Sequence, residues 1–295
     1  MGTVKRVEAG VLSVAYEEAG TTTGTPVLLL HGFPYDPRAY DDVVPLLAEA
    51  GCRVLVPYLR GYGPTRFLSD AILRSGQQAV LGHDLLALMN ALGIARGVVA
   101  GYDWGGRAAC IVAALWPERV RGLVSGGGYN IQDISGALRP QTPERELALW
   151  YQYYFHSERG RAGLEAHRYE LGKLLWRLWS PSWRFDEATY ARTAASFENP
   201  DFVAVVIHSY RHRFALVPGD PAVEDTERRL AAQPPITVPA ITLHGSDNGV
   251  SPAASSERHA RHFTGAYERR VVPGVGHNLP QEAPREFAAA VLSLV

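Results

Sequence analysis

The chain is organised around the stretch Gly101-Tyr102-Asp103-Trp104-Gly105-Gly106. An apolar run at residues 97–100 precedes it, and a second, almost wholly apolar run follows at residues 108–116. A short apolar run, a glycine-rich turn and a longer apolar run predict a buried strand, a tight turn and a buried helix. The pattern Gly-x-nucleophile-x-Gly is that of a nucleophile elbow, in which a cramped turn lifts the central side chain above a sheet. The sequence therefore predicts Asp103 as a nucleophile.

An aspartate at this position decides which chemistry the elbow can support. A carboxylate with an ordinary pKa of about 3.9 is ionised at neutral pH, so it attacks carbon without a general base, whereas a serine would need one. Asp103 therefore favours displacement at an alkyl carbon that bears a leaving group or belongs to a strained ring, and argues against ester cleavage. The alternative is that Asp103 only caps the following helix, because aspartate is favoured at that place.

Length and composition limit the class of protein. A chain of 295 residues can bury a large core, either as one domain or with an inserted segment. It is 46% hydrophobic and 20% charged with a formal net charge of −1, which favours a soluble globular protein and neither a nucleic-acid nor a membrane partner. Its two cysteines predict no disulfide framework and no cysteine-rich metal site. Without a leader-like or membrane-spanning run, we expect a cytoplasmic protein that needs no cofactor or metal and whose oligomeric state is open, a homodimer included.

Short apolar runs alternate with helical patterns in the first part of the chain. The predicted strands are residues 11–16, 27–30, 53–56, 97–100 and 122–125. Helical spacing of apolar residues marks residues 39–50 and 79–92. This alternation predicts the α/β class, with a mostly parallel sheet flanked by helices and ligands at the carboxyl ends of the strands.

The alternation stops at about Tyr129. Residues 129–235 are helical in pattern and rich in aromatic side chains, and strands resume at residues 240–243 and 268–272. We therefore predict a core of residues 1–128 and 236–295, with a helical cap, or lid, inserted at residues 129–235.

Three chemically active side chains each stand just after a predicted strand. They are the nucleophile Asp103, the acid Asp247 and the base His277, and this order is that of the triad in α/β-hydrolases. Asp133 is a rival partner for the histidine, and Asp247 could instead cap the helix after Pro252. We expect a triad of Asp103, Asp247 and His277.

A second loop supplies backbone groups. His31-Gly32-Phe33-Pro34 follows the predicted strand at residues 27–30. The N–H of Phe33, together with that of Trp104, is expected to form an oxyanion hole, and His31 and Pro34 are candidates for substrate binding.

With these motifs the chain resembles the α/β-hydrolase superfamily over nearly its whole length, and in particular its aspartate-nucleophile branch of epoxide hydrolases and dehalogenases. The resemblance rests on His31-Gly-Phe-Pro34, Asp103-Trp-Gly-Gly106, Trp116-Pro-Glu-Arg-Val120 and Gly276-His277. Residues 150–155 and 208–212 resemble the two cap-tyrosine motifs of epoxide hydrolases. The resemblance implies that Tyr151 and Tyr210 donate protons to an epoxide, while Tyr153 and Tyr154 stay open as alternatives for the first tyrosine or as substrate contacts.

The resemblance implies that Asp103 opens an epoxide and that His277 activates the water that releases a vicinal diol. The aromatic-rich cap favours a small apolar or aryl-bearing substrate. A haloalkane or haloacid dehalogenase would use the same Asp and His. The fluoroacetate dehalogenases hold a carboxylate with two arginines, and the chain has Arg107 at the second position but Trp104 at the first. Arg107 is therefore a candidate for substrate binding. A non-catalytic small-ligand binding protein of the same fold is the remoter alternative.

Overall fold

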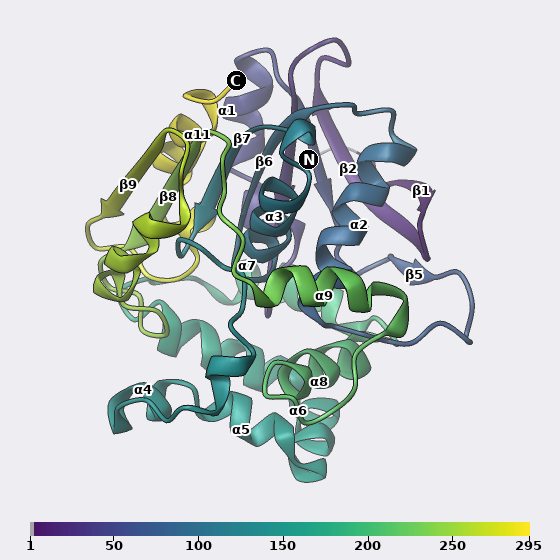
Figure 1. Ribbon diagram of the computed structural model, residues 1–295, viewed down its shortest axis with the longest axis vertical. Helices are drawn as coiled ribbons and strands as arrows, with labels where there is room; N and C mark the ends of the chain where they lie inside the picture. Colours follow the sequence, from purple (N-terminus) through teal and green to yellow (C-terminus); the bar gives the residue numbers. More distant parts are fainter. Residues whose placement is uncertain (1–2) are drawn as a thin grey trace.

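The computed structural model describes residues 3–295. Within them, nine strands form one sheet in the order β1-β2-β4-β3-β6-β7-β8-β9, with β5 paired to β2 (Figure 1). The strands are β1 (Lys5–Ala9), β2 (Leu12–Gly20), β3 (Pro26–Leu30), β4 (Arg53–Pro57), β5 (Arg66–Phe67), β6 (Gly97–Tyr102), β7 (Val120–Gly126), β8 (Ala240–Gly245) and β9 (Tyr267–Val272). All pairs from β4 to β9 along the sheet are parallel, whereas β2 pairs antiparallel with β1, β4 and β5. The predicted mostly parallel sheet is confirmed.

Helices cover both faces of this sheet. α2 (Gln78–Ala91) packs against α3 (Asp103–Leu115) on one face, and α1 (Val43–Glu49) packs against α11 (Pro284–Leu292) on the other (Figure 1). The central strands are accordingly buried along almost their whole length, which is why they read in the sequence as continuous apolar runs. Short 3₁₀ helices complete the core: η1 (Pro37–Tyr40), η2 (Pro117–Arg119) and η6 (Ala253–His262).

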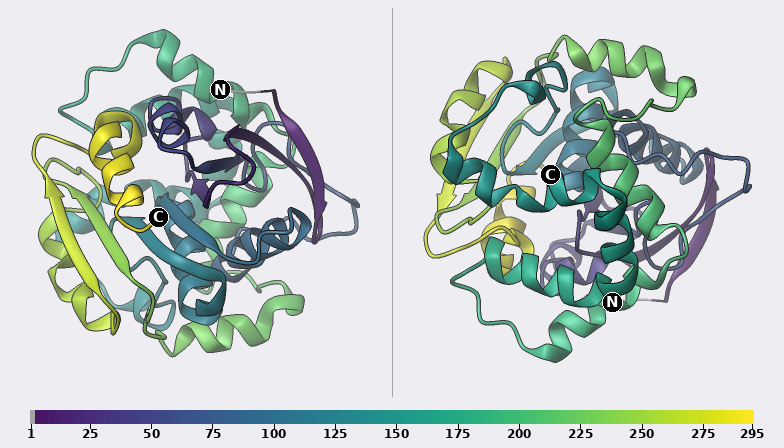
Figure 2. Two further views of the ribbon diagram at one scale, coloured as in Figure 1. Left: turned by 90° about the horizontal axis from the view of Figure 1, so that it is seen from above. Right: turned by 90° about the horizontal axis from the view of Figure 1, so that it is seen from below.

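A helical insert, residues 127–239, joins β7 to β8 without a strand among its residues. It contains α4 (Pro143–Ala148), α5 (Trp150–His156), α6 (Glu158–Trp179), α7 (Glu187–Ala194), α8 (Phe202–His212) and α9 (Glu224–Ala231), with η3 (Ser135–Leu138), η4 (Ala195–Glu198) and η5 (Pro221–Val223). Figure 1 shows α4, α5, α6 and α8 beyond one end of the sheet, and the right-hand view of Figure 2 shows the insert running across that end. α9 lies instead against α2.

Hydrogen bonds fasten the insert to the core. The indole N–H of Trp176 donates to the carbonyl of Pro34 at 2.8 Å, and the hydroxyl of Ser196 donates to the carboxylate of Asp36 at 2.6 Å. At the far end Glu227 accepts the backbone N–H of Ala79 at 2.9 Å. The insert is therefore tied to the core at Pro34, Asp36 and Ala79.

The predicted helix at residues 39–50 and the last helical segment of the chain are both interrupted in the structure. The pattern at residues 39–50 divides into η1 and α1, because the side chain of Asp36 caps the N–H of Arg38 at 2.9 Å and starts a separate short turn. The final helix divides into α10 (Leu279–Glu282) and α11, because Ala283 precedes a proline and adopts φ −141° and ψ 63° instead of helical angles.

Within residues 3–295 no helix is both long and apolar enough to cross a membrane. In the same part of the chain, no cluster of three or more histidine, cysteine, aspartate or glutamate side chains is arranged to hold a metal ion. Cys52 and Cys110 are buried free thiols.

Candidate active site

Asp103 occupies the turn between β6 and α3 in a left-handed conformation, with φ 53°. Such angles are strained for a residue with a side chain and occur chiefly where the surroundings enforce them. The flanking glycines permit the close packing that does so: a Cβ added to Gly105 would lie 1.9 Å from the carbonyl oxygen of Leu30, and one added to Gly101 would lie 2.5 Å from the backbone of Gly105. The predicted elbow is therefore present in the structure.

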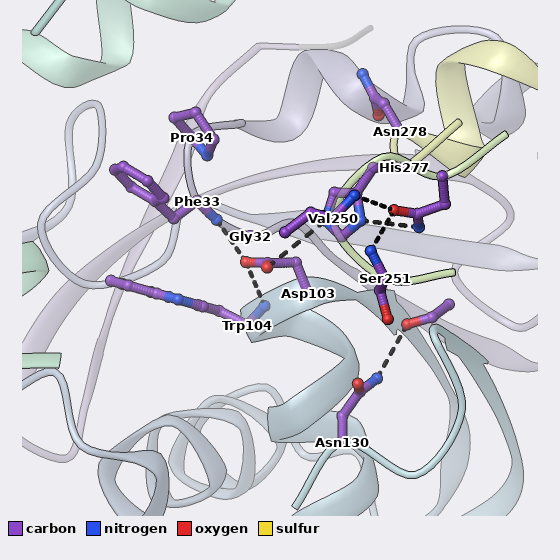
Figure 3. Close-up of polar contacts among 12 residues, drawn as sticks. Gly32, Phe33, Pro34, Asp103, Trp104, Asn130, Val250, Ser251, His277 and Asn278 are labelled. Carbon is purple, nitrogen blue, oxygen red and sulfur yellow. Dashed lines mark hydrogen bonds and ion pairs between the residues drawn. The ribbon is translucent and has the colours of Figure 1, made fainter. Parts of the chain in front are cut away.

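Two backbone N–H groups hold one oxygen of this carboxylate. Phe33 N and Trp104 N donate to Oδ1 of Asp103 at 2.9 Å and 2.7 Å (Figure 3). The structure thus brings both expected donors onto the same oxygen. The second oxygen, Oδ2, faces His277.

His277 lies in the loop after β9, with Nε2 at 3.6 Å from Oδ2 of Asp103 (Figure 3). Residues of the insert hold its backbone: His277 N donates to Trp179 O at 3.1 Å and to Ser180 Oγ at 3.0 Å. The Trp179 ring also contacts the imidazole edge-on, with centroids 5.2 Å apart. The insert therefore helps to position the histidine.

The electrostatic surroundings keep Asp103 ionised. Burial raises the pKa of its carboxyl, but the nearby imidazole of His277, the charge of Arg107 and the N–H of Phe33 together lower it further than burial raises it. The net pKa lies below the ordinary value, so the buried carboxylate is an anion at neutral pH.

The expected contact between Asp247 and His277 is not formed. Asp247 is partly exposed, and its carboxylate accepts hydrogen bonds from the hydroxyls of Ser182 and Ser246. Its backbone N–H is bound to Val275 O at 2.9 Å, which fixes the loop with this side chain turned away from the imidazole. The prediction that Asp247 contacts His277 as the acid of the triad is therefore wrong for this structure.

The rival acid does not reach His277 either. Asp133 is exposed and accepts the hydroxyl of Ser135 and the N–H of Gly136. The group beside Nδ1 of His277 is instead the side-chain amide of Asn248, at 3.1 Å. Sequence reasoning missed Asn248 because it searched this loop for a carboxylate, although Asn248 immediately follows Asp247 after β8.

Two buried tyrosines from the insert stand over the elbow. Tyr151 on α5 and Tyr210 on α8 are 4% and 1% exposed, and their rings meet edge-on with centroids 5.3 Å apart. The Tyr210 ring lies 5.4 Å from that of Phe33 and 6.1 Å from that of Trp104, measured between centroids. Burial raises the pKa of both phenols, and the charge of Asp103 adds to this effect, so both are protonated donors at neutral pH.

The neighbouring tyrosines point elsewhere. Tyr153 is 38% exposed and its hydroxyl donates to Glu146. Tyr154 is half-buried and packs against Trp150. Among the three tyrosines of α5, the structure thus brings only Tyr151 against Tyr210, and neither Tyr153 nor Tyr154 is placed as a substrate contact.

His31 and Pro34 support the loop through backbone contacts. Nε2 of His31 accepts the N–H of Leu59 at 3.1 Å and Nδ1 lies 3.1 Å from Gly32 O, so both ring nitrogens bind backbone. Burial lowers the pKa of His31 to about 4, and the ring is therefore neutral. Pro34 follows a cis peptide bond and uses its carbonyl to accept the indole of Trp176. Both residues thus shape the loop that presents Phe33 N.

Arg107 is buried one turn along α3 from the nucleophile. Its Nε donates to Asn130 O at 3.2 Å, and burial together with the charge of Arg213 lowers its pKa to about 10. Its charge in turn helps to lower the pKa of Asp103.

Comparisons with known proteins place the chain in a family and match its fold. The family model described as the alpha/beta hydrolase fold matches residues 25–284. A crystal structure from Klebsiella pneumoniae subsp. pneumoniae, provisionally described as an epoxide hydrolase, is 48% identical, with a TM-score of 0.96 over 99% of this chain and 96% of that one.

Two curated relatives match over shorter segments. Epoxide hydrolase B of Mycobacterium tuberculosis is 32% identical over 149 residues, which are 46% of this chain and 41% of that protein. Bifunctional epoxide hydrolase 2 of Sus scrofa is 36% identical over 103 residues, 35% of this chain and 18% of that protein. The matched segments thus span less than half the length of either relative. The chain belongs to the α/β-hydrolase family, as an enzyme similar to its epoxide hydrolases.

Proposed function

We propose that this enzyme opens an epoxide to a vicinal diol through a covalent ester on Asp103. The observation that carries the proposal is the pair of buried, protonated phenols, Tyr151 and Tyr210, above an ionised carboxylate. An epoxide oxygen needs a proton donor as its C–O bond breaks, and a phenol that stays protonated at neutral pH is suited to that task.

In the first step, Oδ2 of Asp103 attacks a ring carbon. The C–O bond of the epoxide breaks, its electron pair moves to the ring oxygen, and a phenol of Tyr151 or Tyr210 supplies the proton. Because Oδ1 is held by two backbone N–H groups, Oδ2 is the oxygen free to attack. The product is a hydroxyalkyl ester of Asp103.

In the second step, His277 takes a proton from water and the resulting hydroxide adds to the carboxyl carbon of Asp103. Negative charge develops on Oδ1, which already faces the N–H groups of Phe33 and Trp104. Collapse of this intermediate breaks the ester bond, and the departing oxygen takes the proton held by His277 to give the diol. Asp103 then regains its carboxylate, with one oxygen taken from water, and the proton released from the new carboxyl group returns to the phenolate left by the first step.

The insert acts as a cap in this proposal, over residues 129–235. It supplies both phenols and holds the backbone of His277 through Trp179 and Ser180, so the site is complete only with the cap in place. The aromatic surroundings, with Phe33 and Phe155 beside Tyr210, favour an apolar or aryl-bearing epoxide.

A dehalogenase is the second candidate, and one observation favours it. The indole N–H of Trp104, directly after the nucleophile, is buried without a hydrogen-bond partner among the described residues. A leaving halide needs such donors, and the carboxylate and histidine would be the same. Paired phenols are not required for that reaction, which is why the epoxide hydrolase is preferred.

A turnover assay with matched substrates tests the choice. Purified enzyme is given styrene oxide, a haloalkane and a haloacetate, and the diol and the halide are quantified. We expect diol from the epoxide and little halide from the other two. Halide release without diol formation would reject the epoxide hydrolase in favour of the dehalogenase.

A further inference from the structure

The side-chain amide of Asn248 fits its surroundings in one orientation. Its Oδ1 accepts the backbone N–H of Val250 at 3.1 Å and of Ser251 at 2.8 Å, while Nδ2 lies 3.1 Å from Nδ1 of His277. Rotating the amide by half a turn would set its NH₂ group against two N–H donors. Asn248 is only 8% exposed, so water offers little relief. Nδ2 is therefore the donor, and Nδ1 of His277 is the acceptor.

This assignment fixes where the imidazole proton resides. A neutral histidine carries one ring proton, so an accepting Nδ1 requires the proton on Nε2, which lies 3.6 Å from the carboxylate oxygen of Asp103. A histidine that deprotonates water with Nε2 needs the reverse arrangement, with Nδ1–H donating to a triad acid. The imidazolium formed after such a step would also direct Nδ1–H at the NH₂ group of Asn248. Asn248 therefore disfavours both states that base catalysis requires.

Nearby carboxylates do not replace the missing acid. Asp247 is bonded to Ser182 and Ser246, as described above. Glu282, at the end of α10, accepts the hydroxyl of Ser180 and two backbone N–H groups of residues 276 and 278. Both carboxylates are engaged away from the imidazole.

We propose that Asn248 is a positioning residue that holds His277 in its Nε2–H tautomer and thereby makes hydrolysis of the Asp103 ester the slow step. The inference rests on the function proposed above. Attack by the carboxylate needs no base, so ester formation does not depend on this tautomer. Exchanging the acid of a Ser-His-Asp triad for its amide lowers kcat about 10⁴-fold through the same wrong tautomer. The ester therefore forms quickly and accumulates.

The substitution Asn248→Asp tests the proposal by restoring activity. Aspartate has the same shape, and its carboxylate can accept the N–H groups of Val250 and Ser251 as well as Nδ1–H of His277. In rapid-quench mass spectrometry with styrene oxide, wild type should show a burst of about one ester per active site followed by slow turnover. The variant should hydrolyse the ester at least about 10²-fold faster, with ester formation within about threefold. Asn90→Asp, the same change on the exposed end of α2, should behave as wild type.

A spectroscopic measurement tests the tautomer without any substrate. In protein labelled with ¹⁵N-histidine, the signals absent from a His277→Gln variant identify His277. Wild type should show a protonated Nε2 and an unprotonated Nδ1, and Asn248→Asp should reverse this order.

A protonated Nδ1 in wild type would overturn the proposal, and so would an Asn248→Asp variant whose ester is hydrolysed no faster than that of wild type. Absence of any ester in wild type would reject the proposed function instead, and the nitrogen signals would still decide the tautomer.

Discussion

Replacing Tyr210 with phenylalanine should slow formation of the Asp103 ester about 10²-fold and leave its hydrolysis unchanged. A general acid contributes about 10²–10⁴ in rate, and the lower end applies because Tyr151 still donates. A factor of about 10² corresponds to about 2.7 kcal/mol of activation free energy. The protein should stay folded, because the variant keeps the buried ring against Phe33 and Trp104 and loses only a hydroxyl, at a cost of about 1 kcal/mol.

The substitution Tyr151→Phe should destabilise the fold, unlike Tyr210→Phe, which should cost little. The hydroxyl of Tyr151 accepts the Nε2 group of Gln152 at 2.9 Å, and Gln152 is itself buried. Tyr151→Phe leaves that donor unpaired and should lower the free energy of unfolding by about 1–3 kcal/mol, measured by urea denaturation. Its effect on ester formation should match that of Tyr210→Phe, and the double variant should form almost no ester.

Single-turnover rapid-quench experiments measure these rates separately. Enzyme in excess over styrene oxide is quenched at intervals, and the ester and the diol are followed by mass spectrometry. Equal slowing of both steps, or ester formation at the wild-type rate in the double variant, would refute the assignment of the two phenols as proton donors. Unchanged halide release by the double variant, with no diol from wild type, would favour the dehalogenase.

Three other changes test separate parts of the structure. Burial raises the pKa of Asp36 to about 7, and a folded pKa above the unfolded one means that stability falls as pH rises. Because of this group, the free energy of unfolding of wild type should fall by about 1.4 kcal/mol per pH unit between about pH 4 and 7. Asp36→Asn should not show this fall when both proteins are unfolded with urea at several pH values. A Cβ on Gly32 would lie 2.3 Å from Oδ1 of Asp103, so Gly32→Ala should lower ester formation by at least about 10²-fold in a protein that circular dichroism shows to be folded. Asp247→Asn should keep diol formation within about twofold of wild type, because Asp247 does not contact His277; a loss of orders of magnitude would restore it as the acid of the triad.

Much of the fold was predictable because buried strands and helices have recognisable patterns of apolar residues in the sequence. Strands covered on both faces appear as apolar runs, and their alternation with helices predicted the parallel sheet. The breaks in the helices were harder to predict: that at Ala283 follows from a proline, but that after η1 depends on the side chain of Asp36 meeting one backbone N–H.

The site was predictable where it depends on strand ends. Asp103, Phe33 and His277 each follow a parallel strand, and parallel strands bring their carboxyl ends to one edge of the sheet. The partner of His277 depends instead on hydrogen bonds inside one loop, and these select Asn248 over its neighbour Asp247. The choice of Tyr151 among the tyrosines of α5 likewise depends on helix packing that sequence spacing alone does not determine.

The intact mass of a His277→Gln variant after incubation with styrene oxide shows whether Asp103 is a covalent nucleophile. Without the histidine the ester should form but not be hydrolysed. We predict a gain of one substrate mass, assigned to Asp103 by peptide mapping. An unmodified variant, or a modification at another residue, while wild type converts the same epoxide to diol, would contradict the account.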